Sequence, residues 1–405
     1  MSDPSLEPPA PLRAPFAVAV LLLLVFVSMI GLGLVVPLLP FYGTLFEAEA
    51  WQVTLLFATS ATGQFLGELT WGRLSDRVGR RPVILITILC MAGGYLALAF
   101  ATNIWVAIAA RGFSGFFSGN ISTIQSYVVD VTPPERLAGR LGLIGAAIGV
   151  GFVVGPTLGG VLAQPELGPA GFQPPLFVAT ALSVLAALGA LLFLRESRDA
   201  AARAVQTPSL LAALKDALSD PVLRRLLAST FIAFTGFSSI WAVIGLWGFA
   251  EFGWGPRIVG LLMGAMGLGI VVGQGLLAGP AVRRLGEVRT IALSLGLTGL
   301  PLALMSVTPW QFAAAILLVV AVTANSVSQP ATSLLISRAT GPDQQGAILG
   351  ANAAASALAK VLGPVTSGFL FSAVGHNAPF IFAALAMGPA IYLASRGGRR
   401  LRITP

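Results

Sequence analysis

About twelve long apolar runs, each long enough to cross a bilayer as a helix, dominate this chain of 405 residues. A helix needs about 20 apolar residues to span the hydrocarbon core of a membrane. Only 10% of the residues are charged, whereas a soluble domain carries roughly a quarter. A soluble globule could not hide this much apolar surface from water. The sequence therefore predicts an all-α membrane protein with twelve transmembrane helices.

The expected spans form two groups of six. The first six are 15–39, 51–71, 82–102, 104–129, 139–163 and 174–194, and the second six are 224–247, 256–279, 288–306, 310–336, 346–372 and 377–395. We expect an N-terminal six-helix bundle over 1–195, a cytoplasmic linker over 196–221 and a C-terminal six-helix bundle over 222–405. In the linker, Leu210, Leu211, Leu214 and Leu218 recur at helical spacing, which predicts a short amphipathic helix at the membrane surface.

Basic residues alternate between loops and fix the expected orientation. Arg73, Arg140 and Arg284 lie in loops of one set, and Glu47 and Glu166 lie in loops of the other set. The positive-inside rule then places both termini in the cytoplasm. Arginine is frequent and only two residues are lysine, a composition typical of GC-rich bacteria, so we expect a bacterial inner membrane.

Several classes of function are disfavoured by what the sequence lacks. The net charge of +8 is spread over short loops, which indicates topology and not a nucleic-acid surface. Cys90 and His376 are the only cysteine and histidine, so neither a disulfide nor a His/Cys metal site is expected. No GxxxxGK[ST] phosphate loop is present. We expect no enzyme activity, no cofactor and no nucleic-acid partner.

The two groups of spans repeat each other at a shift of about 207 to 208 residues. The run Gly72–Gly79 (GRLSDRVG) returns as Gly279–Gly286 (GPAVRRLG), and Gly155-Pro156 returns as Gly363-Pro364. A repeat of six spans in the same orientation is typical of transporters whose halves rock about a central cavity.

Three motifs accompany this repeat. The loop after the second span reads GRLSDRVGRR from Gly72 to Arg81; its glycines permit a tight turn, and Asp76 can meet the positive N-terminus of a helix. The first span holds Ile30–Pro40 (IGLGLVVPLLP). The fifth span carries small residues that allow close helix packing and a proline that bends the helix. These are Gly142, Gly151, Gly155, Pro156, Gly159 and Gly160.

Over essentially its whole length the chain resembles the major facilitator superfamily, and within it the proton-coupled exporters of the tetracycline-resistance type. The resemblance implies a conformational latch at the cytoplasmic side, formed by Gly72, Asp76, Arg77, Gly79, Arg80 and Asp130. It also implies that the fifth-span glycines are the antiporter motif of exporters. The alternatives are that the loop charges only set topology and that the glycines are a generic packing face.

Charges inside the spans are the next candidates, since each costs about 2.5–3.5 kcal/mol at a helix centre. Arg111 in the fourth span matches an arginine that the family uses in proton relay or cavity electrostatics. Lys360 lies in the middle of the eleventh span, where its repeat mate is Phe152. We expect Lys360 to face the cavity and either to hold an anionic group or to exchange a proton. Relatives usually carry an acid where this chain has Ser28, so Glu68 in the second span is the fallback proton carrier. A structural role for Arg111, or a Lys360 or Glu68 that reaches the interface, is the alternative.

Neutral polar and aromatic residues mark the expected substrate cavity, although helix-to-helix hydrogen bonding is the alternative for each. They are Gln64, Asn120, Gln125, Phe234, Trp241, Gln274, Asn325, Gln329 and Asn352.

The leading hypothesis is a monomeric secondary transporter that exports small amphipathic, drug-like compounds in exchange for protons. Its expected partners are that substrate and the lipid bilayer. One alternative is a carrier of organic anions or lipid-like metabolites that uses Lys360 and Arg111. Another is a sensor built on a transporter scaffold, which an intact gating loop disfavours.

Overall fold

The computed structural model describes residues 14–197, 218–340 and 344–401, and every regular element in these ranges is a helix. The expected amphipathic helix of the linker lies outside the described residues. The N-terminal half contains α1 (Ala14–Val35), η2 (Val36–Phe41), α2 (Tyr42–Leu45), α3 (Ala50–Val78), α4 (Arg80–Ala99), α5 (Ile104–Ser118), α6 (Ile121–Val131), α7 (Pro134–Leu162), η3 (Pro165–Phe172) and α8 (Gln173–Phe193).

The C-terminal half contains α10 (Pro221–Phe252), α11 (Pro256–Val272), η5 (Gly273–Leu277), α12 (Ala278–Leu285), α13 (Glu287–Met305), α14 (Gln311–Arg338), α15 (Gln345–Ala373) and α16 (Ala378–Leu401). Ten candidate spans in the described part of the chain are long and apolar enough to cross a membrane. The other two expected spans are the polar α3 and the broken pair α5–α6, so the expected all-α membrane fold is confirmed.

Two spans depart from single regular helices. The fourth, expected over 104–129, breaks at Gly119 and Asn120 between α5 and α6. A Cβ atom at Gly119 would lie 2.5 Å from the backbone nitrogen of Glu68, so only glycine permits α3 to approach this closely. The eighth span contains η5, a π-helical turn, before it continues as α12. π-Turns within helices are frequent at functional sites.

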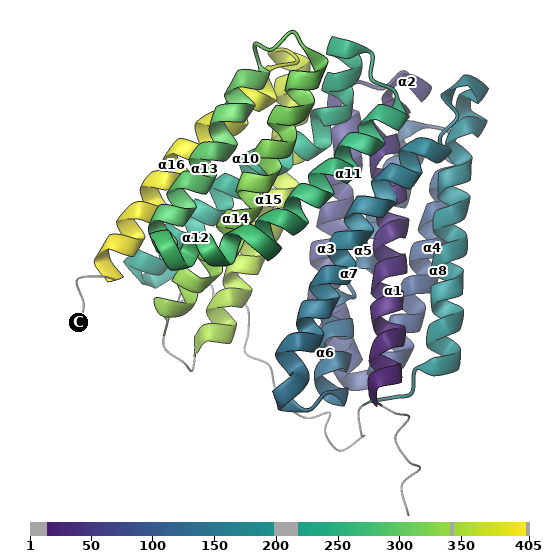
Figure 1. Cartoon of the computed structure of the whole chain (residues 1–405). Helices are drawn as coiled ribbons and strands as arrows, with labels where there is room; N and C mark the ends of the chain where they lie inside the picture. The colour runs from purple at the N-terminus through teal and green to yellow at the C-terminus, as the bar shows by residue number, and fades with distance from the viewer. Residues whose placement is uncertain (1–13, 198–217, 341–343, 402–405) are drawn as a thin grey trace, which may run out of the picture.

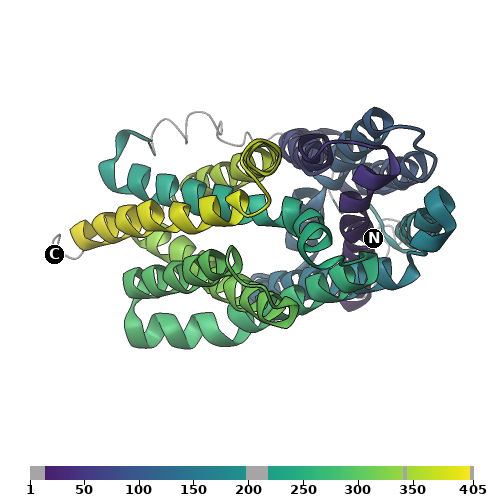
Figure 2. The same ribbon diagram turned by 90° about the horizontal axis from the view of Figure 1, so that it is seen from above.

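The two halves are separate bundles that show the sequence repeat (Figures 1 and 2). In the N-terminal half α1 packs against α7 and α8, and in the C-terminal half α10 packs against α15 and α16. Gly79 and Gly286, which are repeat mates, both end a helix with positive φ, 117° and 77°. Positive φ favours glycine, which explains its presence at both positions.

Among the described residues, the contacts between the halves run from one end of the molecule to about its middle. We call the end where α1 begins and α16 ends the terminal side, and the opposite end the distal side (Figure 1). Across the halves, α7 packs against α11 and α3 packs against α15. On the distal side Gly245 lies against Pro40, and Phe41 lies 6.2 Å from Phe249 between ring centroids.

The space around the glycines of α7 and α15 shows how far the contact between the halves extends along these helices. In α7, a Cβ at Gly149 would meet Val271 of the other half, whereas a Cβ at Gly142 or Gly145 would meet nothing within 4 Å. In α15 the space around Gly346 and Gly350 is likewise open. The halves are therefore joined from the distal side to about the middle of the helices and part toward the terminal side.

Candidate functional site

The glycine motif of α7 serves two interfaces at once. Gly155 and Gly159 bring α7 onto α1, where Cβ atoms would collide with Gly33 and Leu34 respectively. Gly160 faces the other half instead, against Pro256 and Gly260 of α11. The motif thus holds α7 within its own bundle and allows backbone contact with the other bundle.

The remaining motif positions are divided in the same way. Gly151 packs on Met29 of α1, and the carbonyl of Pro156 faces Gly260. Gly142 adjoins open space on the terminal side. In this conformation Gly142 therefore makes no close helix-to-helix contact, unlike the other glycines of the motif.

The junction of α3 and α4, where Gly79 alone separates the two helices, holds a compact charge cluster around a buried arginine. The Arg80 guanidinium lies 2.8 Å from Asp76 and 3.2 Å from Asp130 at the end of α6. It also donates to the Ser75 hydroxyl at 2.6 Å. Gly72 adjoins Ser122, and Arg77 is exposed. The structure thus brings Asp76, Arg80 and Asp130 together within the N-terminal half.

Glu196, which follows α8, completes this cluster and was missed in the sequence. Its carboxylate accepts hydrogen bonds from the backbone N–H groups of Arg80 at 2.8 Å and Arg81 at 3.2 Å. It therefore caps the N-terminus of α4, where a negative charge is favoured by the helix dipole. A side chain at Gly79 would collide with it. The sequence signal was an acid immediately after an apolar span.

Glu68 and Lys360 carry opposite charges on opposite halves. Both are exposed, and their charges are close enough to interact across the gap between α3 and α15. No direct ion pair within 4 Å joins them among those of the described residues. Gln64, one turn before Glu68, hydrogen-bonds to its carboxylate.

The helix geometry explains why the two charges lie in the same region of the interface. Gly368 of α15 lies against Thr54 of α3 in the joined part of the interface. Glu68 follows Thr54 by four turns and so lies on nearly the same face of α3. Lys360 precedes Gly368 by about two turns, toward the terminal side. Both charges therefore lie where the halves begin to part.

Arg111 is buried in the N-terminal half, with 3% of its surface exposed. Its Nη2 atom donates to the Ser60 hydroxyl of α3 at 2.9 Å, while Nε and Nη1 have no hydrogen-bond partner. Its electrostatic neighbours include the neutral, buried side chains of Tyr95 and Tyr42. The buried Ser28 hydroxyl also has no partner.

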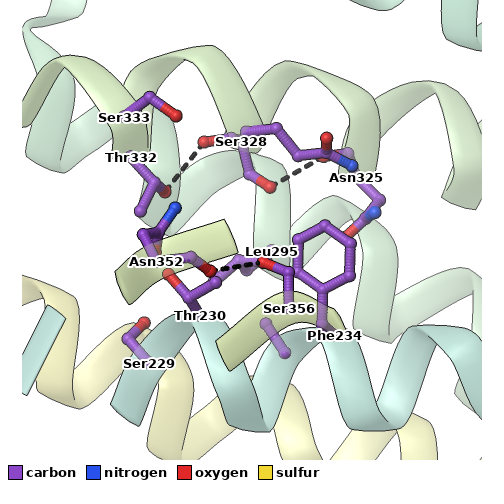
Figure 3. Close-up of a pocket in the computed structure, with 12 residues that line it drawn as sticks. Ser229, Thr230, Phe234, Leu295, Asn325, Ser328, Thr332, Ser333, Asn352 and Ser356 are labelled. Carbon is purple, nitrogen blue, oxygen red and sulfur yellow. Dashed lines mark hydrogen bonds between the residues drawn. The ribbon is translucent and has the colours of Figure 1, made fainter. Parts of the chain in front are cut away.

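A polar pocket with a cavity of about 80 Å³ lies inside the C-terminal half (Figure 3). It is formed by α10, α13, α14 and α15, and its lining contains four of the predicted cavity residues. These are Phe234, Asn325, Gln329 and Asn352. The lining also contains hydroxyl residues that sequence reasoning did not single out, among them Thr230, Ser328 and Ser356.

The other predicted cavity residues do not line this pocket. Asn120 is buried and donates to the Thr87 hydroxyl at 2.7 Å, which is the alternative helix-to-helix role. Trp241 packs against Phe237. Gln125 is exposed on α6, and Gln274 is exposed on the π-turn η5.

Comparison with known proteins agrees with this architecture. The profile of the Major Facilitator Superfamily matches residues 21–249 and 226–400. Multidrug resistance protein 2 of Bacillus subtilis (strain 168) is 28% identical, over 91% of this chain and 92% of that protein. The class G tetracycline resistance protein of Vibrio anguillarum is 32% identical, over 87% and 89% respectively.

A solved structure shares the fold. The crystal structure of a bacterial homologue of the human lysosomal transporter Spinster superposes with a TM-score of 0.75 at 17% identity. The alignment covers 97% of this chain and 94% of that one. Because the family profile matches most of its length, this chain belongs to the Major Facilitator Superfamily.

Proposed function

We propose that this protein is a secondary active exporter of small amphipathic compounds, driven by proton exchange across the bacterial plasma membrane. Its bacterial relatives are named for multidrug and tetracycline resistance. By the positive-inside rule the arginine-rich loops favour a cytoplasmic terminal side, and in the proposed cycle the conformation described here is the one open to the cytoplasm. Export then proceeds by rocking the halves until the distal side parts.

The observation that carries the proposal is the charge interaction between Glu68 and Lys360 across the two halves. A proton that binds Glu68 removes one of the two charges and with it the attraction between α3 and α15. Protonation is thereby linked to how closely the halves approach, as exchange transport requires. Gln64 donates a hydrogen bond to the Glu68 carboxylate from the same helix.

The charge cluster around Arg80 supports the same cycle. Asp76, at the terminal end of α3, is ion-paired with Arg80 inside its own half. In the proposed outward-open state it meets the N-terminus of α15, whose first two turns adjoin open space here at Gly346 and Gly350. The cluster then acts as a latch that forms when the terminal side closes.

The test uses purified protein in liposomes with an imposed pH gradient. Internal pH is followed while a panel of cationic drugs and organic anions is added to the wild type, Glu68→Gln and Lys360→Gln. Glu166→Gln, which removes an acid from the exposed distal segment η3, is the matched control. We expect substrate-dependent proton flux in the wild type and control and its loss in both other variants. Substrate movement without proton flux contradicts the exchange mechanism.

A carrier of organic anions is the second candidate. The observation that favours it is the buried Arg111 guanidinium, two of whose nitrogens have no hydrogen-bond partner, together with Lys360. In the same liposome assay this candidate predicts uptake of anions, and not of cations, that is lost in Arg111→Gln.

A further inference from the structure

The pocket inside the C-terminal half is lined from every side by uncharged groups. Ser229, Thr230 and Phe234 come from α10, and Asn352 and Ser356 come from α15. Asparagine, glutamine and hydroxyl side chains of α14 close the opposite wall (Figure 3). None of the residues that line the pocket is charged. A charged group placed there would lose its hydration, and the lining itself holds no charge to replace it.

The hydroxyl hydrogens of this pocket are largely committed to the backbone. Ser328, Thr332 and Ser356 each donate to a carbonyl of their own helix, at 2.7, 2.8 and 3.0 Å. Ser229 donates to the carbonyl of Ala390 at 2.7 Å. A hydroxyl has one hydrogen but two lone pairs, so these four oxygens can offer only acceptor positions to a ligand.

Two further polar atoms are buried without any partner. They are the Thr230 hydroxyl, in a residue with 6% of its surface exposed, and the Asn352 amide oxygen. A buried polar atom without a hydrogen bond costs about 1–3 kcal/mol, which a ligand recovers if it supplies the missing partner. Both atoms belong to residues that line the same cavity.

Lys360, one turn from the pocket lining along α15, disfavours one class of donor-bearing ligand. It follows Ser356 by one turn of α15, and helical side chains lean toward the helix N-terminus, which here is the direction of Ser356. An ammonium group in the pocket would therefore approach the charge of Lys360. Neutral donors, the hydroxyl and amide N–H groups, have no such conflict.

We infer that this pocket binds a neutral hydrogen-bond-donating group of the ligand, a hydroxyl or a carboxamide, carried on a ring that packs against Phe234 and Leu295. The inference rests on the proposed function in taking the exported compound as the ligand. It places the polar end of that compound inside the C-terminal half, not between the halves. The amide groups of Asn325 and Gln329 supply the complementary donors.

The test compares two probes with the same ring, resorcinol and its dimethyl ether, in which methyl groups replace both donor hydrogens. Binding to purified protein in lipid nanodiscs is measured by saturation-transfer NMR titration, and empty nanodiscs correct for partition into lipid. We expect resorcinol to bind about tenfold more tightly, since the ether leaves buried acceptors unpaired. Thr230→Val and Asn352→Leu should each remove most of this preference.

The matched control is Thr366→Val, a threonine of α15 that also donates to its own helix but does not line the pocket. It should keep the preference of the wild type. Equal binding of both probes, binding of neither, or a preference that survives in both pocket variants overturns the inference. Because binding is measured without transport, an intact preference with no proton flux in liposomes overturns the proposed function alone.

Discussion

The terminal ends of the two halves carry the same kind of ion pair with its charges exchanged. In the N-terminal half Arg80 pairs with Asp130, and in the C-terminal half Glu287 pairs with Arg338. These are repeat mates, because Arg80 and Glu287 are 207 positions apart and Asp130 and Arg338 are 208 apart. The repeat has kept the contact and the glycine turn before it, but not the sign of each charge.

The interior of the molecule shows the opposite behaviour. Glu68 corresponds to Gly275, at a shift of 207, and Lys360 corresponds to Phe152, at a shift of 208. Neither charge has a charged counterpart in the other half. The scaffold is therefore symmetric where the loops must hold the helices, and asymmetric where the proposed coupling takes place.

The sharpest way to break this asymmetry is to move the lysine to its repeat position, with Phe152→Lys and Lys360→Phe combined. Both charges, at 68 and 152, then lie in one half and no longer interact across the interface. We expect proton flux in liposomes to fall by up to about hundredfold, in line with the typical coupling of about 1–3 kcal/mol between two sites. Phe152→Leu is the control, and flux near the wild-type rate in the double variant contradicts the proposed coupling.

A second comparison sets a packed glycine against an open one in the same helix. Gly160→Val places a side chain against the backbone of Gly260 and should lower the free energy of unfolding by about 1–3 kcal/mol. Gly142→Val enters open space and should not lower it through packing. Thermal melting in detergent measures both. Equal losses in the two variants are incompatible with halves that part toward the terminal side.

A third comparison weighs the two ion pairs. Arg80 is 7% exposed at its side chain, so Asp130→Asn leaves a buried charge with fewer partners and should cost about 1–2 kcal/mol. Arg338 is 63% exposed, so Glu287→Gln should cost less than about 1 kcal/mol. The melting temperature should therefore fall further in Asp130→Asn than in Glu287→Gln. A larger loss of stability in Glu287→Gln than in Asp130→Asn would show that the C-terminal ion pair contributes more to stability.

The smallest expected effect concerns the start of α15. Gly346→Ala and Gly350→Ala add methyl groups to open space and favour the helix by up to about 1 kcal/mol each. If this end of α15 meets the N-terminal half when the terminal side closes, both changes should also slow transport modestly. Unchanged transport rates would show that these positions stay open throughout the cycle, and a lower melting temperature would contradict the open space around them.

Much of this architecture is predictable from the sequence, because lipid imposes the length and apolarity of each span. The loop cluster of Asp76, Arg80 and Asp130 follows from a motif whose residues are close in the chain or at a helix end. The cap by Glu196 does not follow from a motif, because Glu196 is 116 and 115 residues from the Arg80 and Arg81 N–H groups that it accepts from. The break at Gly119 depends on how closely α3 approaches, which composition alone does not reveal.

The roles of the polar residues within the spans also could not be predicted from the sequence alone. Asn120 and Asn325 are both amides in the middle of a span, yet Asn120 bonds to Thr87 while Asn325 lines the pocket. Which role an amide takes depends on the helix it faces, and helical periodicity does not identify that neighbour. The unpartnered nitrogens of Arg111 are likewise visible only once its surroundings are known.

The central claim, that the halves rock between two arrangements, is tested most directly by two distances measured in one preparation. Spin labels at Arg136→Cys and Arg284→Cys report the terminal side, and labels at Glu166→Cys and Glu251→Cys report the distal side, each in a Cys90→Ser background. In liposomes, a change of pH or addition of a transported compound should shorten the terminal distance while the distal distance lengthens. Distances that stay fixed, or that change together in the same direction, would contradict the account.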